Sequence, residues 1–288
     1  MSTGSGSNRD VRDRTRGGRG ATGSAGSDLR GDRDLERIER ILGCLDLTSL
    51  GPTDTQEDIV RLCARAARPD PQSELLAPVA AVCVLPRFVG AARDALGDSE
   101  VEVAAVAGGF PSGVASTEER VEQIRHARVE GATEIDTVLD HEALLRGEDA
   151  AVRTQLEASR AAAGPSVLKV ILESGALPGE DTIRRAAALA VSAGADFLKT
   201  STGTREPGAT PGAARTLAEE AFRAMEAGRS VGVKVAGGIR SAEQALEYLD
   251  LVEEVLGPGS ATQERFRIGA SSVLDALVQA WRRHRSIR

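Results

Sequence analysis

Short apolar runs alternate with amphipathic segments from residue 32 to the end of the chain, and this alternation constrains the fold more than any other feature. Such a rhythm is typical of βα units that build a parallel sheet. Eight units over about 250 residues favour a closed (β/α)8 TIM barrel over an open doubly wound sheet, because no glycine-rich fingerprint follows the first strand. The pattern predicts a leading helix at 34–42, strands at 44–48, 79–85, 101–107, 133–139, 167–172, 197–200, 231–235 and 266–269, and helices at 55–67, 87–96, 117–129, 142–163, 181–193, 211–227, 242–256 and 272–285.

The first 31 residues differ in composition from the rest of the chain. They are rich in Gly, Ser, Arg and Asp and contain almost no large apolar side chains, so burial cannot offset the entropy of ordering them. We therefore expect a disordered tail at 1–31, followed by a single barrel domain at 32–288. The tail lacks the apolar stretch of a secretory signal. A solvated tail is the simpler interpretation, and an arm that binds nucleic acid weakly or binds a partner is the alternative.

Composition excludes several classes of function. The net charge is −7, and only seven residues are Phe, Tyr or Trp, which argues against a nucleic-acid binder with a basic or base-stacking surface. No apolar run reaches the ~18 residues of a membrane span. The three cysteines have no metal-ligand spacing and fit reduced thiols in a cytoplasmic protein.

Lysine is rare and unevenly placed in this chain. Of the 36 basic residues only Lys169, Lys199 and Lys234 are lysines, and each lies in a predicted strand. Arginine stays protonated at any relevant pH, whereas a lysine amine can lose its proton and attack a carbonyl. A compositional bias would also make lysine scarce, but it would not place the three lysines in strands rather than on exposed helices. The pattern therefore indicates amine chemistry.

Strand periodicity predicts which of these side chains face the barrel interior. Val233 and Val235 should face the surrounding helices, which turns Lys234 inward. The same rule turns Lys199 inward from the preceding strand, and it suggests that Lys169 and Glu173 pair as internal support. The other side chains expected inside are Cys44, Asp46, Thr48, Glu134, Asp136 and Ile171.

Two inward lysines on adjacent strands suggest how one of them becomes a nucleophile. The pKa of an isolated lysine, about 10.4, must fall to near neutrality, which requires about 4 to 5 kcal/mol. A second ammonium about 4 Å away supplies about 4 kcal/mol at an effective dielectric constant of 20. The argument is symmetric, so it does not say whether Lys199 or Lys234 attacks.

The loops after the seventh and eighth strands carry the residues of an anion site. One reads Ala236-Gly237-Gly238 and the other Gly269-Ala270-Ser271-Ser272 at the start of a helix. Glycines allow close approach of the backbone, and helix N-terminal N–H groups and serine hydroxyls are donors. Because TIM barrels often bind phosphate at these two loops, we expect a phosphate site here.

Seven blocks in series resemble the deoxyribose-phosphate aldolases, and the resemblance runs from about residue 42 to residue 277. The blocks are CLDLT at 44–48, AVCVLPR at 81–87, EID at 134–136, LKVILE at 168–173, DFLKTSTG at 196–203, GVKVAGGIR at 232–240 and GASS at 269–272. The resemblance implies a class I Schiff-base aldolase that needs neither metal nor cofactor. It would cleave 2-deoxy-D-ribose 5-phosphate reversibly to D-glyceraldehyde 3-phosphate and acetaldehyde in deoxyribonucleoside catabolism.

The resemblance also assigns roles to individual residues. It implies that Lys199 is the Schiff-base nucleophile, that Lys234 is the cation that lowers its pKa, and that Asp136 relays protons through a bound water. It places Asp46, Thr48, Cys83, Lys169 and Thr200 near the substrate and Gly203, Thr204, Gly237, Gly238, Ser271 and Ser272 at the phosphate. The expected partner is the small sugar phosphate, without nucleic acid or membrane, and we expect a homo-oligomer, either a dimer or a tetramer.

One departure from the family and two alternative functions accompany this interpretation. Some members have a lysine directly after the Thr-Ser-Thr-Gly turn, where this chain has Thr204 and then Arg205. Either Arg205 replaces that lysine at the phosphate, or this contact is absent. The alternatives are another class I Schiff-base barrel, transaldolase-like or acting on a ketose phosphate, and a non-catalytic barrel that binds phosphorylated ligands.

Overall fold

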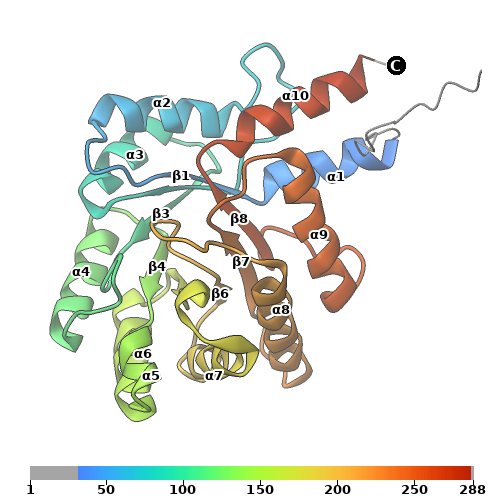
Figure 1. Ribbon diagram of the computed structural model, residues 1–288. Coiled ribbons are helices and arrows are strands. Elements are labelled where there is room, and N and C mark those ends of the chain that lie inside the picture. The colour runs from blue at the N-terminus through green and yellow to red at the C-terminus, as the bar shows by residue number, and fades with distance from the viewer. Residues whose placement is uncertain (1–31, 287–288) are drawn as a thin grey trace, which may run out of the picture.

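The computed structural model describes residues 32–286, and within them eight parallel strands close into a barrel with helices on its outside (Figure 1). The strands are β1 (Leu45–Ser49), β2 (Ala81–Val84), β3 (Glu102–Val106), β4 (Glu134–Val138), β5 (Val167–Ile171), β6 (Phe197–Lys199), β7 (Gly232–Ala236) and β8 (Phe266–Ala270). The helices are α1 (Asp32–Gly43), α2 (Gln56–Ala67), α3 (Val89–Leu96), α4 (Thr117–Val129), α5 (His141–Leu145), α6 (Asp149–Ala163), α7 (Gly179–Ser192), α8 (Pro211–Glu226), α9 (Ala242–Leu256) and α10 (Val273–Arg285), with 3-10 turns η1 (Pro86–Phe88) and η2 (Ser174–Ala176). The predicted TIM barrel with a leading helix is confirmed. The tail predicted at 1–31 lies outside the described residues.

Helix boundaries follow local capping chemistry. Thr55, Ser116 and Ser241 each form a capping box at the start of α2, α4 and α9, which satisfies N–H groups that a helix leaves unpaired. The single helix predicted at 142–163 is wrong, because the chain forms α5 and α6 instead. Gly147 lies between them with φ of 83°, a conformation that glycine adopts readily and that ends a helix.

Alternate strand residues separate an outer core from the barrel interior. Outward-facing side chains such as Leu45, Ile135, Leu198 and Val233 are buried in the main core between strands and helices, as predicted. Inside the barrel a smaller apolar cluster contains Cys83, Ala104 and Val106, with Leu50, Leu85 and Phe110 packed against it. Because this interior cluster is small, the rest of the barrel interior is left to polar and charged side chains.

Strand register brings the inward charged residues to similar heights. Asp136 on β4 is paired in register with Lys169 on β5. Lys199 on β6 is likewise paired with Lys234 on β7. The prediction that the sixth and seventh strands are neighbours, each with one inward lysine, is therefore confirmed.

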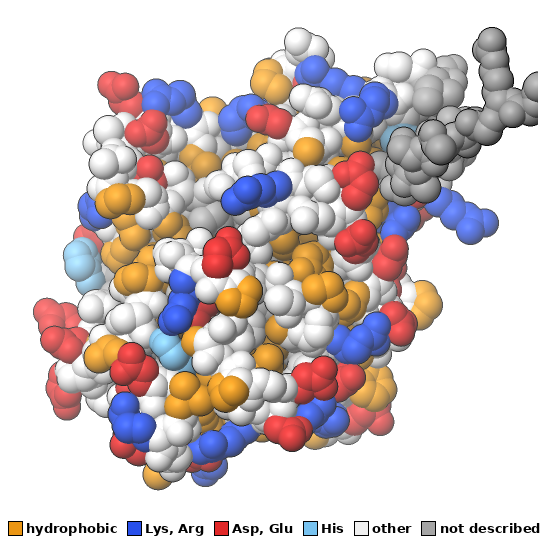
Figure 2. Space-filling view, in the orientation of Figure 1, with side chains coloured by type: hydrophobic (Ala, Val, Ile, Leu, Met, Phe, Trp, Pro, Cys, Tyr) orange, Lys and Arg blue, Asp and Glu red, His pale blue; other side chains and the backbone are white. Residues whose placement is uncertain are grey.

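The surface has no single dominant charge on the face shown in Figure 2. Acidic and basic side chains are interspersed there, with hydrophobic groups between them. Among residues 32–286, no helix combines the length and the apolar character needed to cross a membrane.

Gly208→Ala should destabilise the protein, because this glycine packs against the loop after β7. A Cβ at Gly208 would lie 2.6 Å from the Gly237 carbonyl oxygen, and Ala209 donates a hydrogen bond to that same oxygen at 3.0 Å. We expect a loss of about 1–3 kcal/mol from this overpacking. Gly212→Ala is the matched control, since a Cβ there meets nothing within 4 Å and alanine is favoured in a helix by about 0.5–1 kcal/mol. Thermal unfolding of both variants measures the difference, and equal Tm values would contradict the packing argument.

Candidate active site

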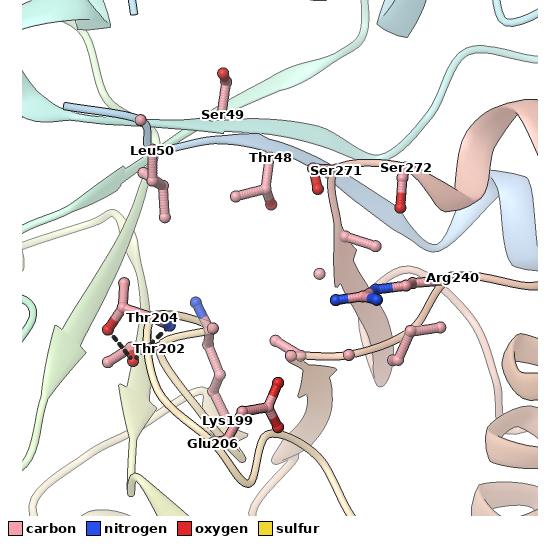
Figure 3. A pocket seen from close by; sticks show the side chains of 18 residues that line it. Thr48, Ser49, Leu50, Lys199, Thr202, Thr204, Glu206, Arg240, Ser271 and Ser272 are labelled. Atoms are coloured by element: carbon pink, nitrogen blue, oxygen red, sulfur yellow. Dashed lines mark hydrogen bonds between the residues drawn. The ribbon is translucent and has the colours of Figure 1, made fainter. Parts of the chain in front are cut away.

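A pocket of about 400 Å³ opens at the carboxyl ends of the strands. Lys199 is the one lysine of the chain that lines it, and in Figure 3 its amine points into the open space. The loops after β1, β6, β7 and β8 form the walls. The lining residues are Thr48, Ser49, Leu50, Gly51, Lys199, Thr202, Gly203, Thr204, Glu206, Ala236, Gly237, Gly238, Ile239, Arg240, Gly269, Ala270, Ser271 and Ser272.

Asp136 joins the three lysines beneath this pocket. Its Oδ2 accepts hydrogen bonds from Lys199 Nζ and from Lys234 Nζ, each at 2.7 Å. Its Oδ1 accepts one from Lys169 Nζ at 3.1 Å. The Lys199 side chain keeps 3% exposure, whereas those of Lys169 and Lys234 have none. Of the three amines, that of Lys199 is therefore the one within reach of a molecule in the pocket.

Arg267 on β8 belongs to the same network of buried charged side chains. Its guanidinium donates to Asp46 Oδ1 at 2.6 Å and to Glu134 Oε1 at 2.8 Å. Asp46 in turn pairs with Lys234 at 2.5 Å and with Lys169 at 3.3 Å, and Glu134 accepts a hydrogen bond from Lys169. We call this set the buried charge cluster; its members are Asp46, Glu134, Asp136, Lys169, Lys199, Lys234 and Arg267.

The charges of the buried charge cluster do not balance. It contains four basic groups and three carboxylates. Burying a charge without a partner is costly, so the cluster favours one basic group in its uncharged form. Lys199 pairs with one carboxylate, whereas Lys234 pairs with two and Lys169 with three. Lys199 is thus the amine that loses its proton at the least cost.

The pKa of the Lys199 amine is lowered from the ordinary lysine value. Burial is the largest cause, the carboxylate of Asp136 opposes it, and the ammonium of Lys234 lowers the pKa further. The pKa of Lys234 moves in the opposite direction: burial lowers it, but Asp136 and Asp46 together raise it above the ordinary value. This difference resolves the symmetry that strand periodicity left open, because it makes Lys199 the amine that more readily loses its proton.

Two carboxylates of the cluster, Asp136 and Asp46, are held in their charged form. Burial alone would raise the pKa of Asp136, but Lys169, Lys199 and Lys234 hold it well below its usual range. Asp46 is affected in the same way by Lys169, Lys234 and Arg267. Near neutral pH these groups are therefore bases and hydrogen-bond acceptors.

The opposite wall of the pocket has the features of an anion subsite, formed by Gly203, Gly237, Gly238, Arg240, Ser271 and Ser272. The three glycines have φ values of 82°, 95° and 82°, which expose backbone that a side chain would cover. Ser272 is the N-cap of α10, and its own side chain makes no capping hydrogen bond. Figure 3 shows Ser271, Ser272 and the Arg240 guanidinium across the pocket from Lys199. N–H groups at a helix N-terminus together with a guanidinium favour a phosphate.

The structure brings some of the other predicted residues to the pocket and leaves others behind it. Thr48 and Thr204 line the pocket, whereas Asp46 and Lys169 lie below it with no exposure. Cys83 is also buried, with its Sγ 3.9 Å from Asp136 Oδ2.

Two predicted interactions are not found where the sequence placed them. The Thr200 hydroxyl bridges to β7, since it donates to the Ala236 carbonyl at 3.1 Å and accepts from the Ala236 N–H at 3.0 Å; it does not line the pocket. The predicted pair of Lys169 and Glu173 is wrong. Lys169 binds the carboxylates of the buried charge cluster, and Glu173 accepts from Thr202 instead. Strand periodicity gives the direction of a side chain but not its height in the barrel.

Sequence reasoning missed Arg267, Arg240 and Glu206. Arg267 lies between Phe266 and Ile268, which face the outer core, so periodicity alone would have turned it inward. Arg240 belongs to one of the family-like blocks and had no role assigned to it. Glu206 lines the pocket, and its Oε2 accepts from the Gly208 N–H at 3.2 Å; no sequence signal marked it. Arg205 is exposed and does not line the pocket.

The family comparison and several similar solved structures are of aldolases. The model of a family described as DeoC/LacD family aldolase matches residues 42–272. A candidate deoxyribose-phosphate aldolase from Coccidioides immitis is 31% identical, with 84% of this chain and 86% of that chain covered and a TM-score of 0.71. The apo form of a candidate deoxyribose-phosphate aldolase from Toxoplasma gondii ME49 is 27% identical, with 86% and 98% covered and a TM-score of 0.76. The tetrameric deoxyribose phosphate aldolase from Aeropyrum pernix is 27% identical, with 87% and 98% covered and a TM-score of 0.65.

Arg267→Met should destabilise the protein strongly near neutral pH, because it leaves Asp46 and Glu134 without their shared guanidinium. Breaking a buried ion pair from one side costs about 3–5 kcal/mol. The pKa of Asp46 is lowered by Lys169, Lys234 and Arg267, and a carboxyl group with a depressed pKa contributes stability above about pH 4 that it loses as the pH falls. The difference from wild type should therefore be largest near pH 7 and shrink in acid. Urea unfolding from pH 3 to pH 7 measures it, with the half-exposed Arg265→Met as control. A difference that does not change with pH would contradict this account.

Proposed function

The chain belongs to the DeoC/LacD family of aldolases, and from this premise we propose that it is a deoxyribose-phosphate aldolase. The reaction would be the reversible cleavage of 2-deoxy-D-ribose 5-phosphate to D-glyceraldehyde 3-phosphate and acetaldehyde, through a Schiff base on Lys199. The observation that carries the proposal is the position of Lys199. Its amine reaches a pocket with an anion subsite while its Nζ shares Asp136 Oδ2 with Lys234.

Schiff-base formation would use the difference in pKa between Lys199 and Lys234. The uncharged amine of Lys199 attacks the aldehyde carbon C1 of the open-chain sugar, and the resulting carbinolamine loses water to form a protonated imine. The pKa of Lys199 is lowered by burial and by Lys234, which supports Lys199 as nucleophile and Lys234 as the retained cation. Arginine at position 199 would keep the charge and lack the chemistry.

Carbon–carbon cleavage would follow from the protonated imine. A base removes the proton of the C3 hydroxyl, the C2–C3 bond breaks, and its electron pair moves toward the imine nitrogen to give an enamine. Glyceraldehyde 3-phosphate then leaves. Protonation at C2 and addition of water at C1 release acetaldehyde and the free amine. Asp136 would relay protons in these steps through a water; its charged carboxylate, 2.7 Å from the Lys199 amine, supports this role.

The anion subsite would hold the 5-phosphate. Gly203, Gly237 and Gly238 offer exposed backbone, Ser271 and Ser272 lie at the N-terminus of α10, and Arg240 adds a positive charge. A phosphate bound there would direct the rest of the sugar across the pocket toward Lys199 (Figure 3). This positioning reduces the loss of freedom that the reaction would otherwise require.

We further propose that the enzyme is a homo-oligomer, either a dimer or a tetramer, acting in the cytoplasm on deoxyribose phosphate from deoxyribonucleoside breakdown. The tetrameric aldolase from Aeropyrum pernix, with 98% of its chain covered, supports the first part. The relatives named as deoxyribose-phosphate aldolases support the substrate.

Borohydride added with deoxyribose 5-phosphate should reduce the Schiff base and leave a covalent adduct on Lys199. Peptide mass spectrometry locates it, and the peptides that contain Lys169 and Lys234 are internal controls. Lys199→Arg should remove both the adduct and the turnover, and its circular dichroism should match wild type. An adduct on Lys234 instead would overturn the assigned roles. Release of acetaldehyde, coupled to NADH oxidation, separates this aldolase from one that acts on a ketose phosphate, and no adduct at all would favour a non-catalytic barrel.

A further inference from the structure

Glu173 is held in a backbone conformation that its side chain disfavours. It follows β5 with φ of 51° and ψ of 56°, and among residues 32–286 it is the one residue other than glycine with positive φ. L-amino acids rarely adopt this region, and such strain persists where the surrounding structure requires it, often at functional sites. The conformation of Glu173 therefore needs a reason.

The carboxylate of Glu173 is buried without a cation. The residue has no exposure, and within the described residues it is paired with no Lys, Arg or His. Its Oε2 accepts hydrogen bonds from the Thr202 hydroxyl at 2.6 Å and from the Thr202 N–H at 3.3 Å. Burying a carboxylate is costly. The buried carboxylate of Glu173 makes these two hydrogen bonds to Thr202 and, among residues 32–286, no ion pair. Glu173 thus connects the end of β5 to the turn that follows Lys199.

The connection continues from Thr202 to the pocket. The Thr202 hydroxyl oxygen accepts from the Thr204 N–H at 3.2 Å and lies 2.9 Å from the Thr204 hydroxyl oxygen. Figure 3 draws both contacts, and Thr202, Gly203 and Thr204 line the pocket. A chain of hydrogen bonds therefore runs from the buried carboxylate to an exposed hydroxyl at the edge of the site.

The Glu173 carboxylate, at the start of this chain of hydrogen bonds, decides which group donates in each of them. A carboxylate only accepts, and a threonine hydroxyl has a single proton. The Thr202 proton is therefore used toward Glu173, so the Thr204 hydroxyl must donate to Thr202 across their contact. The Thr204 N–H is also used. While this contact is kept, Thr204 presents to the pocket only the lone pairs of its oxygen, which can accept from a hydroxyl group but cannot donate to a phosphate.

We propose that Glu173 is a positioning residue that locks the 202–204 turn and makes the Thr204 oxygen an acceptor for a hydroxyl group of the sugar. The role of the Thr204 oxygen rests on the sugar phosphate substrate proposed above. The fixing of the 202–204 turn by Glu173, which we call the lock, does not depend on the substrate. The acceptor role replaces the phosphate contact that the sequence suggested for Thr204. It also removes any need for a cation at position 204, because the side chain there would meet the sugar, while the Gly203 backbone would still face the phosphate.

The lock is tested by amide hydrogen exchange of Thr202 and Thr204 in Glu173→Gly. Glycine removes the carboxylate and tolerates the left-handed backbone, so the fold should survive. We expect exchange of these two amides to rise by about tenfold or more, the range for losing a hydrogen bond to a charged group, and the amides of α9 to stay unchanged. Glu173→Gln keeps an accepting oxygen and should restore most of the protection. Glu157→Ala, an exposed carboxylate on α6, is the control. Unchanged exchange in Glu173→Gly would overturn the lock.

The orientation of Thr204 is tested with Thr204→Val and Thr204→Ser. Binding of inorganic phosphate, followed by ³¹P NMR, should stay within about twofold of wild type in Thr204→Val, whereas KM for deoxyribose 5-phosphate should rise by about fivefold to tenfold, as for one lost hydrogen bond. Thr204→Ser should resemble wild type in both measurements, and Arg240→Met should weaken phosphate binding. Weaker phosphate binding in Thr204→Val, or an unchanged KM, would overturn the acceptor role. If wild type does not cleave the sugar phosphate, the proposed substrate fails, while hydrogen exchange and phosphate binding still decide the lock and the phosphate contact.

Discussion

The hydrogen bonds that the Asp136 carboxylate accepts from three lysines are the interaction on which the rest of this site depends. One oxygen lies 2.7 Å from both Lys199 Nζ and Lys234 Nζ, and the other lies 3.1 Å from Lys169 Nζ. Without Asp136 three ammonium groups would be buried together, an arrangement that desolvation and mutual repulsion both oppose. With it the cluster still has one basic group too many, and the cost of burying that charge lowers the pKa of the least paired lysine. A lysine with a lowered pKa thus follows from the charge balance of the barrel interior.

The buried charge cluster and the proposed ligand contacts lie in different parts of the barrel. The register of β4 with β5 and of β6 with β7 sets the lysines around Asp136. Gly269 on β8 leaves room for the chain of Lys234, because a Cβ there would lie 3.0 Å from Lys234 Cε. The loops above supply the anion subsite and the Thr202–Thr204 edge. Residues that set the pKa of the amine therefore lie in strands, whereas the residues proposed to hold the ligand lie in loops that can vary without disturbing the amine.

Much of this arrangement could be predicted from the sequence, and the failures have physical reasons. The alternation of segments predicted the barrel, and the period of two turned Lys199, Lys234 and Asp136 to one interior. The same rule says nothing about height along the barrel, so it paired Lys169 with Glu173, which the left-handed backbone directs to Thr202 instead. Arg267 was missed because arginine is common in this chain, although its place between two outward residues marked it. The break at Gly147 was missed because one glycine in an otherwise helical pattern is often tolerated.

The charge state of each lysine is the most direct test of this account, and a chain with only three lysines makes it measurable. Selective ¹³C labelling at lysine Cε gives three NMR signals, which Lys→Arg variants at each position assign. We expect the Lys199 signal to titrate below the ordinary lysine value of about 10.4, while Lys169 and Lys234 remain ammonium groups throughout that range. If the three signals titrate together, or if Lys234 loses its proton before Lys199, the charge balance around Asp136 does not select the reactive amine.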